Sequence, residues 1–155
     1  MRYTFSSDIN SISPNYRRKV TIAIAAIIVQ HFTRRLSIPT QQEIAKNYGI
    51  PSRLVTDTID RLLSAGIINT VMIDSSKEIY GYTPAVDPSL LTVRYVLDRI
   101  NSRGRNNFIP QFDKHFPGVE TIADRILAVQ DNIDTGTRLA DLSIELAEPH
   151  GRQKK

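Results

Sequence analysis

The sequence of 155 residues contains no cysteine. Disulfide scaffolds, thiolate zinc sites, iron–sulfur clusters and cysteine nucleophiles are therefore excluded. Histidine is scarce as well, since His31, His115 and His150 are the only three and lie far apart in the sequence. The composition argues against a metalloenzyme, and we expect neither a metal site nor a cofactor.

Long apolar runs are also missing. The most apolar stretch is Val20–Val29, in which only Thr21 interrupts ten residues. As a helix it would extend about 15 Å, half of the ~30 Å hydrocarbon core of a bilayer. Residues 1–5 do not begin a charged segment followed by an apolar one, so no secretory signal is recognised. We expect a buried helix at 20–29 and a cytoplasmic protein.

Charge is distributed unevenly, although the net charge is only +4. Residues 1–38 carry six basic side chains and one acidic one, a net charge of +5, whereas residues 39–83 carry four and five, a net charge of −1. The densest basic cluster is Arg17, Arg18 and Lys19. Such a cluster is typical of a solvated helix surface, or of a surface that meets phosphate in nucleic acid or at a membrane.

The first long helix is predicted to begin with Ser13 as its N-cap and Pro14 in its first turn, and to end near Thr33. Apolar residues at helical spacing form one core face, and His31 is expected to pack on it with a satisfied hydrogen bond. The opposite side is apolar too, which is typical of a helix at the centre of a core or shared with a partner. The candidates for a dimer face on that side are Ile22, Ala26 and Val29.

Two shorter helices follow. Thr40 and Glu43 have the spacing of a capping box, and Gly49 fits the left-handed position that ends a helix. A second, amphipathic helix is predicted over Ser52–Ser64, ended by Gly66. Two short helices joined by a tight glycine turn are typical of a helix-turn-helix.

A β-hairpin is predicted next, because β-branched and apolar residues at 67–73 and 79–83 flank a polar turn at 74–77. The order of helix, helix-turn-helix and hairpin is that of a winged helix domain. The predicted fold class is therefore mainly α with a small β-hairpin (α+β), a winged helix-turn-helix with a C-terminal helical extension.

The chain is predicted to be organised in five parts. A helix near 92–103 completes the winged helix domain, a second helix begins near residue 119, and apolar residues at 139–146 predict a short last helix. The parts are an N-terminal segment (1–12), the winged helix domain (13–104), a loop (105–118), the helical extension (119–147) and a disordered tail (148–155).

The second helix of such a motif usually enters the major groove of DNA, while the hairpin touches the backbone. The candidates for contact with double-stranded DNA are Thr40, Gln41, Ser52, Arg53, Thr56, Arg61 and Lys77. However, Asp57 and Asp60 offset the charges of Arg53 and Arg61 on the same outward face, which weakens the electrostatic basis of DNA affinity. A non-catalytic DNA-binding or regulatory module and a module for protein contact or homodimerisation both remain open.

Catalytic motifs are not recognised. A nucleophile elbow, a P-loop, a paired-histidine zinc helix and a dinucleotide glycine fingerprint are all missing from the sequence. The local cluster with acid–base potential, Asp113-Lys114-His115, is expected to be a solvated turn. We therefore predict that the protein is not an enzyme.

Two family resemblances emerge from these residues. The hairpin exit at 81–85 (GYTPA), the LTV sequence at 91–93 and a helix ending near Gly104 resemble the Rrf2-type winged helix regulators over residues 40–104. Members of that family often sense through iron–sulfur clusters held by cysteine, and this chemistry cannot apply to a chain without cysteine. The first resemblance implies a DNA-binding transcription regulator.

The closer resemblance is to the cytosolic C-terminal region of the YihY/BrkB family of bacterial inner-membrane proteins. It covers residues 10–104 and is carried by the stretches 12–19 (ISPNYRRK), 50–55 (IPSRLV) and 91–97 (LTVRYVL). It implies a fragment at the cytoplasmic face of the inner membrane, whose partner is the membrane-spanning part of the same polypeptide. The motifs here do not support that family's "ribonuclease BN-like" label. The alternative function is thus an interaction or dimerisation domain that does not bind DNA.

Overall fold

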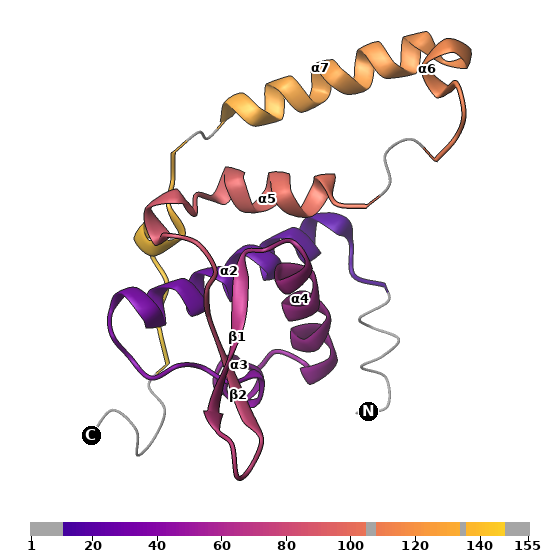
Figure 1. Ribbon diagram of the computed structural model, residues 1–155. Coiled ribbons are helices and arrows are strands. Elements are labelled where there is room, and N and C mark those ends of the chain that lie inside the picture. The colour runs from indigo at the N-terminus through magenta and orange to yellow at the C-terminus, as the bar shows by residue number, and fades with distance from the viewer. Residues whose placement is uncertain (1–10, 105–107, 134–135, 148–155) are drawn as a thin grey trace.

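The computed structural model describes residues 11–104, 108–133 and 136–147 (Figure 1). The predicted disordered tail and the first ten residues of the predicted N-terminal segment lie outside these ranges. The elements are α2 (Pro14–Thr33), α3 (Gln41–Tyr48), α4 (Ser52–Ser64), β1 (Ile68–Asp74), β2 (Ile79–Pro84), η2 (Pro88–Leu90), α5 (Val93–Ser102), α6 (Phe112–His115), α7 (Pro117–Ile133) and η3 (Leu139–Asp141). The predicted fold class, mainly helical with one antiparallel hairpin, is confirmed.

Helix α2 forms the centre of the core. The Ser13 hydroxyl accepts a hydrogen bond from the backbone N–H of Tyr16, and Pro14 occupies the first turn, as predicted. The helix contacts η3, β2 and α4, so it is surrounded by the chain's own elements. Its residues from 24 to 31 are all buried. The imidazole Nδ1 of His31 lies 2.7 Å from the Ser37 carbonyl oxygen, which agrees with a hydrogen-bonded core histidine.

The predicted dimer face on α2 needs correction. Ala26 and Val29 have no exposed surface within a single chain, and Ile22 is half-buried against the same core. The helix is apolar nearly all round because the C-terminal part of the chain packs on it. Ala26 and Val29 therefore offer no surface to a second copy.

The helix-turn-helix follows the local signals in the sequence. Thr40 and Glu43 form both halves of the capping box on α3. Gly49 adopts φ +64°, a left-handed conformation that glycine accepts without a steric penalty. Helix α4 buries Val55, Ile59 and Leu62 in the core. The short turn at Gly49 thus fixes the orientation of α4 relative to α3.

The hairpin is attached to the body where β2 runs alongside the segment before α3. β1 and β2 pair in antiparallel register, with an irregularity between Met72 and Asp74. The N–H of Tyr82 donates to the Pro39 carbonyl, and Thr40 bridges Gly81, so the segment before α3 lies along β2 like a short third strand. This hairpin (residues 68–84), here called the wing, is therefore anchored along β2 while its tip projects from the body (Figure 1).

The last described segment, residues 136–147, lies across the body as an extended strap. Val93 donates its N–H to the Thr137 carbonyl, and Leu139 donates its N–H to the Leu91 carbonyl. The Gln30 side-chain amide, which is fully buried, donates to the carbonyls of Leu139 and Leu142. This strap replaces the predicted short last helix: only the single 3-10 turn η3 forms, because several backbone groups of the strap bond to α2 and the start of α5 instead of to each other.

Between α5 and the strap, the chain leaves the body as a helical arm, residues 108–133. The predicted loop over 105–118 is shorter than expected, since α6 lies within it and α7 begins at Pro117, a residue suited to the first turn of a helix. Figure 1 shows α7 alongside α5 but set apart from the body. In the described part of the chain, its extensive contacts are with α6 alone.

Candidate nucleic-acid interface

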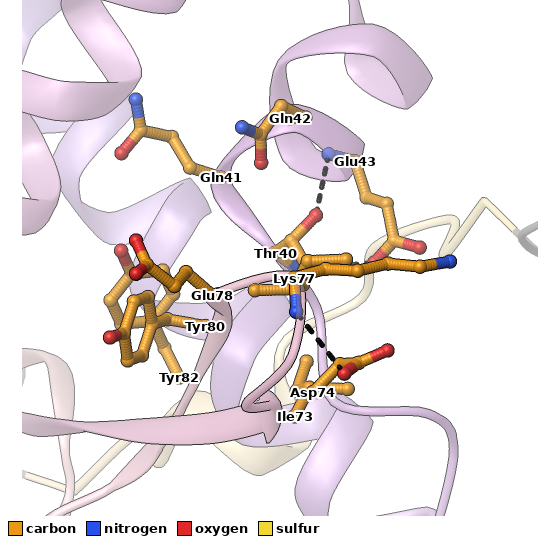
Figure 2. Close-up of a pocket in the computed structure, with 11 residues that line it drawn as sticks. Thr40, Gln41, Gln42, Glu43, Ile73, Asp74, Lys77, Glu78, Tyr80 and Tyr82 are labelled. Carbon is orange, nitrogen blue, oxygen red and sulfur yellow. Dashed lines mark hydrogen bonds between the residues drawn. The ribbon is translucent and has the colours of Figure 1, made fainter.

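The end of the molecule that carries the wing also carries the N-terminus of α3 (Figure 2). Helix α4 begins after Pro51, which provides no side-chain cap, and Ser52 and Arg53 in its first turn are exposed. The first N–H groups of a helix without such a cap, together with the helix dipole, favour an anion. The first turn of α4 is thus the part of the predicted site best suited to a phosphate or a base edge.

The side chains of three predicted DNA contacts form hydrogen bonds within the protein itself. Thr40 is only 6% exposed, and its hydroxyl accepts the N–H of Glu43 (Figure 2). The amide of Gln41 donates a hydrogen bond to the Thr56 hydroxyl, which itself donates to the Ser52 carbonyl. The bond between Gln41 and Thr56 joins α3 to α4, whereas the Thr40 bond caps α3 and the bond from Thr56 to Ser52 lies within α4. All three side chains thus make hydrogen bonds within the helix-turn-helix.

An ion pair changes the predicted pattern of charge on α4. Arg17 on α2 places its Nη1 2.6 Å from the Asp57 carboxylate, and the Nε of Arg61 lies 3.5 Å from the same oxygen. The basic cluster at 17–19 is thereby divided, because Arg17 turns to α4 while Arg18 and Lys19 stay exposed. The middle of α4 is therefore close to neutral. Arg53 and Lys77 are both exposed near the predicted reading surface.

A cavity of about 670 Å³ lies between the N-terminus of α3 and the wing (Figure 2). Its lining includes three carboxylates, Glu43, Asp74 and Glu78, and one cation, Lys77. The hydroxyl and N–H of Ser76, together with the Lys77 N–H, bond to Asp74 and lower the pKa of its carboxyl group, so the negative charge persists. The cavity is acidic, which opposes the entry of a phosphate.

Two tyrosines in this cavity were missed by the sequence reasoning. Tyr80 and Tyr82 lie two residues apart on β2, and alternation along a strand places both on one face. Burial raises the pKa of Tyr82, and the nearby charge of Asp60 on α4 raises it further. Their two-residue spacing in the sequence, within a predicted strand, indicates that the two side chains share a face of the hairpin. Their hydroxyl groups could donate hydrogen bonds to a ligand in the cavity between the wing and the N-terminus of α3.

The sequence cluster at 113–115 lies in α6, where Asp113 and His115 are exposed. Among the described residues, no three His, Asp or Glu side chains come close enough together to hold a metal ion. In the same described ranges, no helix has both the length and the hydrophobicity that crossing a bilayer requires.

No protein-family model matches the chain, and no curated protein matches its sequence. Solved structures do share its fold. The chain is similar to IscR of T. potens, with 15% identity, a TM-score of 0.58 and coverage of 86% of this chain and 87% of that one. It is also similar to CymR, the global cysteine regulator of B. subtilis, with 14% identity, a TM-score of 0.52 and coverage of 84% and 94%.

A third similar structure is described as a putative DNA binding protein, with 17% identity, a TM-score of 0.56 and coverage of 81% and 97%. At these identities the comparisons show the fold, and they confirm the predicted winged helix. They give no support to the resemblance to YihY/BrkB membrane proteins.

Proposed function

We propose that this chain is a non-catalytic winged helix module that binds double-stranded DNA and belongs with the Rrf2-type regulators. The observation that carries the proposal is the first turn of α4, where Ser52 and Arg53 are exposed at a helix start without a side-chain cap. Lys77 at the tip of the wing supplies a second cation for the backbone. Two similar structures support the same class of function, since one is described as the global cysteine regulator of B. subtilis and the other as a putative DNA binding protein.

The test is DNA binding by the full chain as a function of salt, measured by fluorescence anisotropy with labelled genomic duplexes. Arg53→Glu is expected to weaken binding by about 1–3 kcal/mol, roughly 5- to 150-fold, because a base or phosphate contact is replaced by repulsion. The slope of log affinity against log salt should fall by about one. Arg103→Glu is the matched control, because Arg103 is exposed and is the C-cap of α5, a helix outside the helix-turn-helix and the wing. Figure 1 shows α5 at the opposite end of the body from the tip of the wing.

The proposal fails if the wild-type chain binds no duplex at low salt, or if both arginine variants lose the same affinity. An equal loss would mean that net charge alone attracts the DNA.

The acidic wing provides a second test, in which a substitution is expected to strengthen DNA binding. Glu78 adopts φ +53° in the hairpin turn, a conformation that asparagine accepts more readily than glutamate. Glu78→Asn should therefore keep the turn while removing a negative charge near Lys77. We expect severalfold tighter DNA binding at low salt, with a gain that shrinks as salt screens the charge. If the anisotropy titrations give Glu78→Asn an unchanged or lower affinity for DNA, the wing does not lie near the DNA.

A module for protein contact, without DNA binding, is the second candidate. The acidic lining of the cavity favours it, because Glu43, Asp74 and Glu78 outnumber Lys77 there. Under this alternative neither Arg53→Glu nor Glu78→Asn has an effect, since no duplex is bound in any variant.

A further inference from the structure

An ion pair between α2 and α4 brings a basic side chain to the helix that we expect to meet DNA. The Nη1 of Arg17 lies 2.6 Å from Oδ2 of Asp57, and the two side chains are 21% and 43% exposed. The Nε of Arg61, one turn further along α4, lies 3.5 Å from the same oxygen. A charged hydrogen bond this short between partly covered groups is among the stronger polar contacts of a protein. Two guanidinium groups thus converge on one carboxylate oxygen.

Helix α4 has no excess of positive charge of its own. It contains two arginines and two aspartates, so its formal charges cancel. Asp60 is exposed, as is Arg53, and Asp57 is only partly covered. A carboxylate near the phosphates of a duplex lowers the affinity, because like charges repel each other. With Arg17 bound to it, α4 presents three arginines against two aspartates and therefore carries a net charge of +1.

The position of Arg17 on α2 directs its side chain to α4. Its backbone N–H donates to the Ser13 carbonyl, and its carbonyl accepts a hydrogen bond from the hydroxyl of Thr21, a residue that is buried. Arg18, the next residue, is exposed instead. A long basic side chain can lie along the protein surface and place its charged end at a distant partner. The guanidinium of Arg17 is therefore engaged with Asp57, whereas that of its neighbour extends from an exposed position.

We propose that Arg17 is a positioning residue for DNA binding, which neutralises and fixes the Asp57 carboxylate so that α4 can approach the duplex, and which does not touch the DNA itself. The role rests on the proposed function, since it concerns the affinity of α4 for DNA. An ion pair with a merely structural role would act through the orientation of α4, and its loss would weaken binding equally at every salt concentration. A neutralising ion pair acts through charge, so salt reduces the effect of its loss, and removal of the carboxylate repairs it.

A double-mutant cycle on the full chain, measured by fluorescence anisotropy with labelled genomic duplexes, tests this role. Arg17→Gln is expected to weaken DNA binding by about tenfold at low salt, because the Asp57 carboxylate then adds its negative charge near the duplex, and the loss should shrink as salt is raised. Asp57→Asn in the wild type should change the affinity by less than about threefold, since the carboxylate is already neutralised. The same substitution in Arg17→Gln should restore most of the lost affinity.

Arg18→Gln is the matched control, because it removes the same charge from the neighbouring exposed position. Asp57→Asn should have the same small effect in Arg18→Gln as in the wild type. The urea midpoint of Arg17→Gln should stay near that of the wild type, since a partly exposed ion pair contributes little to stability. Arg17→Lys keeps the charge and can be measured even if Arg17→Gln does not fold. It should bind within about threefold of the wild type, and a loss of about tenfold would overturn the proposal.

Two further results would overturn the role of Arg17. A loss in Arg17→Gln that Asp57→Asn does not restore would mean that Arg17 contacts the DNA directly. An unchanged affinity of Arg17→Gln would mean that the carboxylate lies away from the duplex. If Arg53→Glu weakens binding and Arg17→Gln does not, the inference fails and the proposed function stands. If the wild-type chain binds no duplex, both fail.

Discussion

Replacing Leu139 by alanine is expected to lower the free energy of unfolding by about 2–5 kcal/mol, the usual cost of truncating a fully buried leucine. Leu139 has no exposed surface and lies in η3, which packs on α2. The truncation removes aliphatic contacts and leaves a cavity beside a helix that forms the centre of the core. Urea unfolding followed by circular dichroism measures the change.

Leu90→Ala is the matched control, because Leu90 is 60% exposed and the same truncation there should cost well under 1 kcal/mol. A loss for Leu139→Ala no larger than that of the control would mean that the strap is only loosely attached to α2. The assignment of the second apolar side of α2 to the chain's own C-terminal segment would then be wrong.

The second large effect is expected for Gly81→Ala. A Cβ atom built on Gly81 would lie 2.5 Å from Cγ2 of Ile38, 2.8 Å from Cδ1 of Ile73 and 2.9 Å from the Pro39 carbonyl oxygen. Since one of these atoms belongs to the backbone, the chain must shift to accommodate the methyl group. We expect a loss of about 1–3 kcal/mol in unfolding free energy, as for other overpacked sites.

This substitution should also loosen the wing. The hydrogen bond from Tyr82 to Pro39 and the bridge from Thr40 to Gly81 are made at the same place. Faster amide exchange at Tyr82 would report the displacement. Gly118→Ala is the control, because nothing lies within 4 Å of its added Cβ and alanine favours a helix. It should be neutral or slightly stabilising, and a similar loss in both variants would contradict the argument from close packing.

The helix ends that the sequence predicted correctly are those set by interactions between residues close together in the chain. Ser13, the pair Thr40 and Glu43, and the glycines at 49 and 66 each sit at a helix end where the structure has one. Such signals act within four residues, so one sequence is enough to read them. The order of the elements then followed from the hydrophobic pattern, which changes from helical spacing to the β-branched and apolar runs of the hairpin.

The sequence could not show which segment covers which face. An apolar second side on α2 is equally compatible with a partner and with a distant part of the same chain, and the strap lies more than 100 residues away from Gln30. The same limit applies to the site. Arg17 and Asp57 are 40 residues apart, so nothing in the sequence indicates that they neutralise each other.

The Gln30 bonds also bear on how the protein is made. A ribosome releases α2, α3, α4 and the wing before the strap is synthesised, and the carbonyls that Gln30 binds come 109 and 112 residues later. Until then, the apolar flank of α2 lacks its cover, and partly assembled chains of this kind are prone to aggregate or to engage chaperones. Closure over so long a separation is slow, so we expect the nascent chain to reach its native state only after residue 142 has emerged.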